Sequence, residues 1–194
     1  MFKREVCYFK DFGKQNTGQT IEAAKKAVLS LGLKYVVVAS ASGITGVKTA
    51  EAFKGTGTKI VVVTEYAGMA EFKEENRRKL RRLKAKVITS THAFLTPAES
   101  ISKLYSGYCS ENTIIKEVLR RFSQGLKVGA EIAMMATDVG AVPPSEDIVC
   151  IAGTGSGADT AILVKSCHSD DFFHKEKGIE IREIIAMPRK KKFW

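Results

Sequence analysis

Uninterrupted runs of apolar, β-branched residues alternate along the chain with segments whose apolar positions recur at helical spacing. Two runs, at residues 35–39 and 59–64, have the pattern of strands that are buried on both faces of a parallel sheet. Further strands are predicted at residues 6–9, 86–89, 148–152 and 160–165. Residues 179–187 alternate enough to form either another strand or a short helix.

The helical segments lie between these strands. Asn16 is predicted to cap the first helix, with Gln19 completing a variant of the capping box, and Gly32 ends it. The apolar face of this helix is formed by Ile21, Ala24, Val28 and Leu31. A short helix is predicted at residues 45–53, and a strongly charged one within residues 71–86.

Two helices are predicted in the second half of the chain. Ser110 is a candidate N-cap for the first, whose apolar face collects Ile114, Ile115, Val118, Leu119 and Phe122. Gly125 is expected to separate it from a helix over residues 127–139, which is rich in Ala, Met and Gly and should be deeply buried. The pair Pro143-Pro144 ends that element.

Alternating strands and helices predict an α/β fold with a mostly parallel sheet that is covered on both faces. The strands at residues 148–152 and 160–165 are joined by a loop too short for a helical crossover, so they should pair antiparallel. No linker or internal repeat divides the chain. We therefore expect one domain over residues 1–194, with a basic tail at residues 189–194.

The net charge of +10 is concentrated in residues 71–86 and in the tail. In the first segment acidic residues precede basic ones, an order that complements a helix macrodipole, and Glu74–Arg78 and Glu75–Lys79 have favourable i,i+4 spacing. A solvated helix face is therefore favoured over a nucleic-acid surface, which usually adds stacking aromatics or a recognisable module. Whether the tail contacts RNA or another subunit stays open.

Composition narrows the location of the protein. No apolar run approaches the ~20 residues that a membrane span needs, and no apolar core follows the basic N-terminus, so a cytoplasmic protein is expected. The scattered cysteines, Cys7, Cys109, Cys150 and Cys167, disfavour a disulfide framework or a zinc site. Cys7 and Cys150 fall in apolar strand-like runs, where free cysteine behaves as a small hydrophobe.

A first candidate site is the segment Ser40-Ala41-Ser42-Gly43-Ile44-Thr45-Gly46, between a buried strand and a helix. Backbone N–H groups at such a helix N-terminus attract anions, and the hydroxyls add uncharged donors. The segment matches neither a Walker loop nor the dinucleotide fingerprint. It could equally do no more than cap the helix.

A second candidate is the segment Gly153-Thr154-Gly155-Ser156-Gly157-Ala158-Asp159-Thr160. Its glycines allow the backbone to approach a ligand closely, although a flexible hairpin turn is the alternative. Both segments lie at or just beyond carboxyl ends of strands, where open α/β sheets bind ligands.

Other residues could line the same crevice. Thr64, Glu65 and His92 follow two further strands, and His92 either hydrogen-bonds a ligand or satisfies its neighbours. The side chains of Tyr66 and Phe94 offer flat surfaces for an aromatic ring or simply pack. Lys127 and Glu131 lie one helical turn apart, which favours an ion pair over a catalytic carboxylate, and no nucleophile–base arrangement is visible.

Several stretches resemble the C-terminal domain of pyruvate kinase, namely residues 36–45 (VVVASASGIT), 60–64 (IVVVT) and 149–153 (VCIAG) with the glycine-rich loop that follows. The chain is more similar still to a family of stand-alone, mostly archaeal proteins described as pyruvate-kinase C-terminal-domain-like. The stretches that carry this resemblance are residues 7–9 (CYF), 13–17 (GKQNT), 123–128 (SQGLKV), 157–161 (GADTA) and 184–189 (IIAMPR).

The resemblance implies a three-layer α/β/α fold, a phosphate-ligand crevice, bound flavin mononucleotide (FMN) and a homo-oligomer. It implies that Ser40, Ser42, Gly43 and Thr45 hold the phosphate. The glycine-rich loop would close over the flavin or its ribityl chain, with Thr64 and His92 nearby. The residues of the loop that would do so are Gly153, Thr154, Gly155, Ser156, Gly157, Asp159 and Thr160. A (β/α)₈ barrel needs roughly 250 residues, so no pyruvate kinase activity is expected. Ile44 stands where pyruvate kinase has a basic residue, which disfavours a sugar bisphosphate.

Three hypotheses follow. The first is an FMN-binding protein, with or without redox activity; its catalytic residues are not identified by the sequence. The second is a non-catalytic sensor of another phosphorylated metabolite. The third is a basic RNA- or partner-binding protein.

Overall fold

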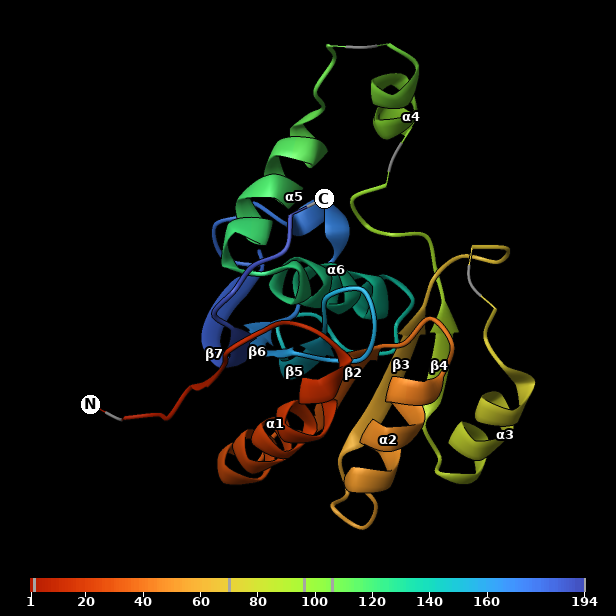
Figure 1. Ribbon diagram of the computed structural model, residues 1–194, viewed down its shortest axis with the longest axis vertical. Coiled ribbons are helices and arrows are strands. Elements are labelled where there is room, and N and C mark those ends of the chain that lie inside the picture. The colour runs from red at the N-terminus through yellow and green to blue at the C-terminus, as the bar shows by residue number, and fades with distance from the viewer. Residues whose placement is uncertain (2, 70, 96, 106, 194) are drawn as a thin grey trace.

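The computed structural model describes residues 1, 3–69, 71–95, 97–105 and 107–193. Within these residues, seven strands form one sheet in the order β1-β7-β6-β5-β2-β3-β4 (Figure 1). The strands are β1 (Cys7–Phe9), β2 (Tyr35–Ala39), β3 (Lys59–Thr64), β4 (Lys86–Thr89), β5 (Asp147–Ala152), β6 (Thr160–Lys165) and β7 (Glu180–Pro188). The α-helices are α1 (Thr17–Leu31), α2 (Ile44–Ala52), α3 (Glu74–Arg82), α4 (Pro97–Leu104), α5 (Glu111–Phe122) and α6 (Gln124–Asp138).

The sheet is mixed, as the sequence predicts. Strands β5, β2, β3 and β4 run parallel to one another, and β1 runs parallel to β7. Strand β6 pairs antiparallel with both β5 and β7. The prediction of an α/β fold with antiparallel strands toward the C-terminal end is confirmed, and the ambiguous segment near residue 180 is strand β7.

Helices cover both faces of the sheet, which gives three layers (Figure 1). A hydrophobic core lies on each face of the sheet. Alternate residues of β2 belong to one core or the other, because successive side chains of a strand point to opposite faces. Val36 and Val38 belong to a cluster that also contains side chains of α1, α2 and α3, such as Ile21 and Leu80. Val37 belongs to the opposite cluster, which contains apolar side chains of α6.

Two local expectations are wrong, and one helix was not predicted. Helix α6 begins at Gln124, capped by the Ser123 side chain, so Gly125 lies in its first turn rather than between two helices. The described residues show no side-chain cap at the start of α1, because the amide of Asn16 instead donates to the carbonyl oxygen of Asp11 at 2.7 Å. Helix α4 was not predicted, although Pro97 at its first position is a favoured helix start.

Helix α5 starts where predicted, with the Ser110 hydroxyl accepting a hydrogen bond from the Thr113 N–H group at 3.2 Å. Its apolar face is divided. Side chains of Ile115 and Leu119 pack beside Phe94, whereas Ile114, Val118 and Phe122 are exposed. These three exposed residues form an apolar stripe along α5.

The charged segments are extensively paired within the chain. Glu74 contacts Arg78 at 3.5 Å and Glu75 contacts Lys79 at 2.6 Å, which confirms both predicted i,i+4 pairs. In the tail, Lys190 lies 3.6 Å from Asp11. Among the residues that the structure describes, no helix combines the length and apolarity needed to cross a bilayer.

Candidate functional site

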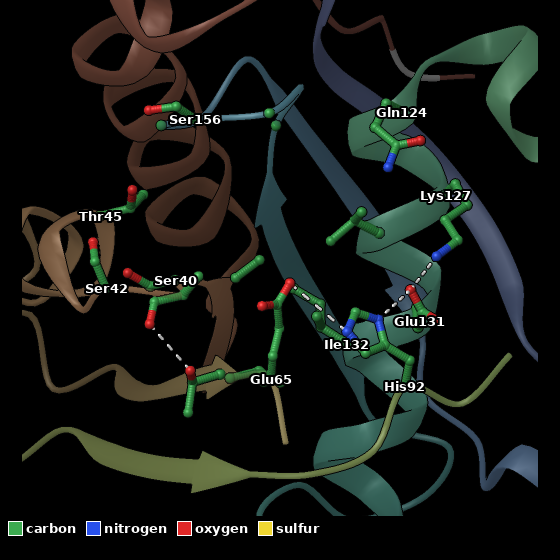
Figure 2. A pocket seen from close by; sticks show the side chains of 18 of the residues that line it. Ser40, Ser42, Thr45, Glu65, His92, Gln124, Lys127, Glu131, Ile132 and Ser156 are labelled. Atoms are coloured by element: carbon green, nitrogen blue, oxygen red, sulfur yellow. Dashed lines mark hydrogen bonds and ion pairs between the residues drawn. The ribbon is translucent and has the colours of Figure 1, made fainter. Parts of the chain in front are cut away.

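A cavity of about 400 Å³ lies at the carboxyl ends of β2 and β3, between α2, α6 and the loop that follows β5 (Figure 2). Ser40, Ser42 and Thr45 lie on one side of it in Figure 2, and the α6 side chains lie on the other with His92. Its lining consists of Ala39, Ser40, Ala41, Ser42, Thr45, Val63, Thr64, Glu65, His92, Gln124, Lys127, Val128, Glu131, Ile132, Met135, Gly153, Gly155, Ser156 and Gly157.

The N-terminus of α2 forms one wall. The Ser40 hydroxyl accepts a hydrogen bond from the Gly46 N–H group at 3.1 Å, which ties the strand end to the first helical turn. The N–H groups of Ile44 and Thr45 have no acceptor among the described residues. Unsatisfied N–H groups at a helix start, together with the helix dipole, favour a bound anion.

Gly43 shapes this wall from behind rather than lining it. Its φ is +88°, and an added Cβ would lie 2.7 Å from the Cβ of Asn76 and 2.9 Å from the Phe72 ring. Only glycine adopts this backbone conformation and fits this space. Gly43 therefore sets the direction in which the backbone enters α2.

The glycine-rich loop between β5 and β6 forms a second wall. Gly155 and Gly157 have φ values of +76° and +72°, and Gly153, Gly155, Ser156 and Gly157 line the cavity. A Cβ on Gly153 would lie 2.6 Å from the Gly157 carbonyl oxygen, so the loop closes tightly on itself. Glycine backbone at this point allows a ligand to approach the main chain closely.

A group of buried charged residues on and beside α6 forms the third wall. Glu131 is fully buried and forms an ion pair with Lys127, as the sequence predicts. Its carboxylate also accepts a hydrogen bond from the Phe94 N–H group at 3.3 Å and lies 3.4 Å from His92 Nδ1. Burial acts to raise the pKa of Glu131, but the hydrogen bonds from His92 and Lys127 outweigh it and lower this pKa.

His92 follows β4 and lies between this wall and Glu65, the residue after β3. Its Nε2 atom is buried and has no hydrogen-bond partner among the described residues. The nearest carboxylate oxygen on that side, Glu65 Oε1, lies 3.8 Å away, too far for a hydrogen bond. The ring of Tyr66 meets the imidazole edge-on, with centroids 6.5 Å apart.

The cavity brings together most of the candidate residues of the sequence analysis. The candidates that line it are Ser40, Ser42, Thr45, Thr64, His92, Gly153, Gly155, Ser156 and Gly157. Gly43, Thr154, Asp159 and Thr160 lie behind the lining. Thr154, Asp159 and Thr160 are buried and bond one another, since Asp159 accepts from the Thr154 N–H group at 3.2 Å and from the Thr160 hydroxyl at 2.9 Å.

Sequence reasoning missed the contribution of α6. Gln124, Lys127 and Glu131 all line the cavity, although none was a candidate binding residue. The available signal was the i,i+4 charge pair in a helix that is otherwise apolar. Phe94, considered as a platform for a ring, instead packs in the core against Phe172, with ring centroids 5.6 Å apart.

No family model matches the chain. It is similar to a solved structure of a pyruvate kinase from Cryptosporidium parvum, with 11% sequence identity, a TM-score of 0.39, and coverage of 76% of this chain and 22% of that one. A Cryptosporidium parvum pyruvate kinase in complex with ADP gives 12% identity, a TM-score of 0.36, and coverage of 75% and 22%. The chain thus spans about a fifth of the length of these structures.

Proposed function

We propose that this cavity binds a small phosphate-bearing ligand, and that the ligand is FMN. The observation that carries the proposal is that the N-terminus of α2 and the glycine-rich loop face the same cavity. The N–H groups of Ile44 and Thr45 at the start of α2 have no acceptor among the described residues, and the hydroxyls of Ser42 and Thr45 are further donors. A phosphate group suits such neutral donors because it brings the negative charge that the helix dipole stabilises.

The rest of the cavity suits an extended ligand. Its volume of about 400 Å³ lies within the range of roughly 300–1,000 Å³ that is usual for small-molecule sites. Val63, Val128, Ile132 and Met135 supply apolar surface, and Gln124 and His92 supply polar contacts. A flat ring with polar edges fits this mixture, and the unpartnered Nε2 atom of His92 is a polar group that a ligand would satisfy.

The proposal concerns binding. FMN, when bound, supplies hydride and electron transfer, and a protein contributes position and electrostatics. The residues of this chain would hold the phosphate at α2 and the loop, and present the α6 wall to the opposite end of the ligand. We assign no reaction to the site.

An absorption spectrum of the purified protein tests the proposal, recorded after mixing with excess FMN and desalting. We expect a retained flavin band in the wild type. The Ser42→Glu variant should lose at least about tenfold in affinity, because a carboxylate beside the phosphate is repelled. Ser30→Glu, an exposed change on α1, is the matched control and should bind FMN normally.

Thermal unfolding of each variant separates loss of binding from loss of folding. A wild-type protein that retains no flavin would overturn the FMN assignment and favour a sensor of another phosphorylated metabolite. A thermal-shift screen of phosphorylated metabolites would then identify the ligand. RNA binding, the third reading, would show itself as affinity that falls steeply with added salt.

A homo-oligomer, the stand-alone archaeal family and a cytoplasmic location stay predictions. The apolar stripe of α5 is the surface that a second copy would bury, since Ile114 and Val118 are each 56% exposed and Phe122 is 49% exposed. Sedimentation that shows only a 21.2 kDa species would exclude the homo-oligomer.

A further inference from the structure

The imidazole of His92 is held by a carboxylate on one side only. Its Nδ1 atom lies 3.4 Å from Glu131 Oε2. An ionised carboxylate only accepts hydrogen bonds, so we assign the hydrogen atom of the neutral ring to Nδ1. In the neutral ring the other nitrogen, Nε2, is then a hydrogen-bond acceptor.

Glu131 is fixed and cannot turn away from His92. Lys127 and the Phe94 N–H group hold its two oxygen atoms, and the Glu131 side chain is 1% exposed. The ion pair with Lys127 also compensates the carboxylate charge. In this structure the imidazole turns Nδ1 toward Glu131 and Nε2 toward Glu65.

The group nearest to Nε2 on this side is a carboxylate, which offers no hydrogen atom to an acceptor. Among the described residues it has no hydrogen-bond partner, and the atom itself is buried. Glu65 Oε1 lies 3.8 Å away and is another acceptor, while Tyr66 meets the ring edge-on. A buried acceptor without a donor costs free energy, and such groups in folded proteins are usually satisfied by a ligand or a water molecule.

We infer that His92 Nε2 and the Glu65 carboxylate form an acceptor pair that receives hydrogen-bond donors from the end of the ligand remote from its phosphate. This inference rests on the proposed function. It narrows the ligand class to phosphorylated compounds that carry N–H or O–H donors at the opposite end. FMN belongs to this class, because the edge of its ring system, remote from the phosphate, has an N–H group.

The tautomer of His92 can be tested without any ligand, by long-range ¹H–¹⁵N NMR of the imidazole at neutral pH. We expect Nδ1 to give a signal of the protonated type and Nε2 one of the unprotonated type. A signal of the protonated type from Nε2 would overturn the inference, because that atom would then donate rather than accept.

The ligand arm uses inorganic phosphate, ribose 5-phosphate and FMN as probes. Inorganic phosphate should shift the backbone signals of Ser42 and Gly155 and leave His92 Nε2 unchanged. FMN should shift both sets, and ribose 5-phosphate, which lacks the ring, should shift only the signals of Ser42 and Gly155. Shifts at Ser42 and Gly155 without a shift at Nε2 for FMN overturn the inference and leave phosphate binding intact. Unchanged signals at Ser42 and Gly155 with all three probes overturn the proposed function instead.

Variants of His92 distinguish the loss of the hydrogen-bond acceptor from a change of side chain that keeps an acceptor. His92→Leu removes the acceptor and should weaken FMN binding about tenfold. His92→Gln can place an amide oxygen near the position of Nε2 and should retain most of the affinity. His168→Leu is the control, since His168 pairs with Asp138 and does not line the cavity. Equal FMN affinity in the wild type and in His92→Leu would contradict the acceptor role.

Discussion

The carboxylate of Asp159 accepts a hydrogen bond from the backbone N–H group of Gly13 at 2.9 Å, across 146 positions of the sequence. A second bond, from the Ala158 N–H group to the Thr17 hydroxyl at 3.0 Å, lies beside it. A Cβ on Gly157 would lie 2.5 Å from that hydroxyl and 2.6 Å from Lys14 Cα. The segment before α1 and the first residue of α1 therefore support the glycine-rich loop from behind, and the shape of the cavity depends on them.

Asp159→Ala should lower the free energy of unfolding by about 3 kcal/mol, because buried donors lose their acceptor. The carboxylate is fully buried and accepts hydrogen bonds from Gly13, Thr154 and Thr160. Urea denaturation followed by circular dichroism measures the loss. Asp170→Ala, at an exposed position, is the control and should change stability by less than about 0.5 kcal/mol. A loss for Asp159→Ala no larger than for this control would contradict the anchoring role.

Two glycines in helices should respond in opposite directions to the same substitution. A Cβ on Gly125 would lie 2.5 Å from the Cβ of Thr160, a β-branched residue of a central strand that has no room to move. Gly125→Ala should therefore cost about 2 kcal/mol through overpacking. Gly18→Ala in α1, where no described atom lies within 4 Å of the new methyl group, should stabilise by about 0.5–1 kcal/mol. Thermal unfolding of both variants decides, and stabilisation by Gly125→Ala would show that α6 can shift away from β6.

Gly125 also shows where sequence reasoning ends. Strands β3, β4 and β6 have the predicted boundaries, because dense β-branched runs encode both strand propensity and burial. A glycine between two apolar segments, by contrast, indicates a break when only local preferences are considered. The reason for a glycine at position 125 is instead a tertiary contact: a side chain there would meet Thr160, which lies 35 positions later in the chain.

The candidate site, too, was predictable from local sequence only in part. Ser40, Ser42 and Thr45 were predictable, because a loop after a buried strand has a known place at the edge of a parallel sheet. Lys127 and Glu131 were not, because helical periodicity predicts only that α6 is buried. Which end of the sheet α6 reaches is decided by how it packs across β5 and β6, and this depends on the whole chain.

The Lys127–Glu131 pair should behave as a coupled unit in stability measurements. Glu131→Gln leaves Lys127 buried without a counter-charge, and Lys127→Met leaves Glu131 without its ammonium partner; each should cost about 3 kcal/mol. The double variant should lose less than the sum of the two, with a coupling energy of about 1–3 kcal/mol. Urea denaturation of the four proteins in this cycle gives the value. Strict additivity would mean that the two charges are stabilised independently, for instance by water.

Protonation of Glu99 at acid pH should weaken the attachment of α4 to α5. This side chain accepts hydrogen bonds from Ser110, from Thr113 at 2.8 Å and from Lys116 at 2.6 Å, and so attaches α4 to α5. Burial acts to raise the pKa of Glu99, but the bonds from Lys116, Ser110 and Thr113 outweigh it and lower the pKa from 4.5 to about 2. An ionised carboxylate with a lowered pKa stabilises the folded state above pH 4.5, and this contribution is lost as the pH falls toward 2.

Hydrogen exchange of the α4 backbone measures this release directly. In the wild type, protection of α4 should decrease between pH 4.5 and 2, after correction for the intrinsic exchange rate. Glu99→Gln should already be less protected at neutral pH, by about 1–3 kcal/mol of opening free energy, because the charged acceptor is gone. Its protection should then stay constant over the same acidic range. A Glu99→Gln variant that loses α4 protection in parallel with the wild type would assign the acid sensitivity to another group, such as Glu117, whose hydrogen bonds to Arg120 and Arg121 lie on the same helix as Lys116.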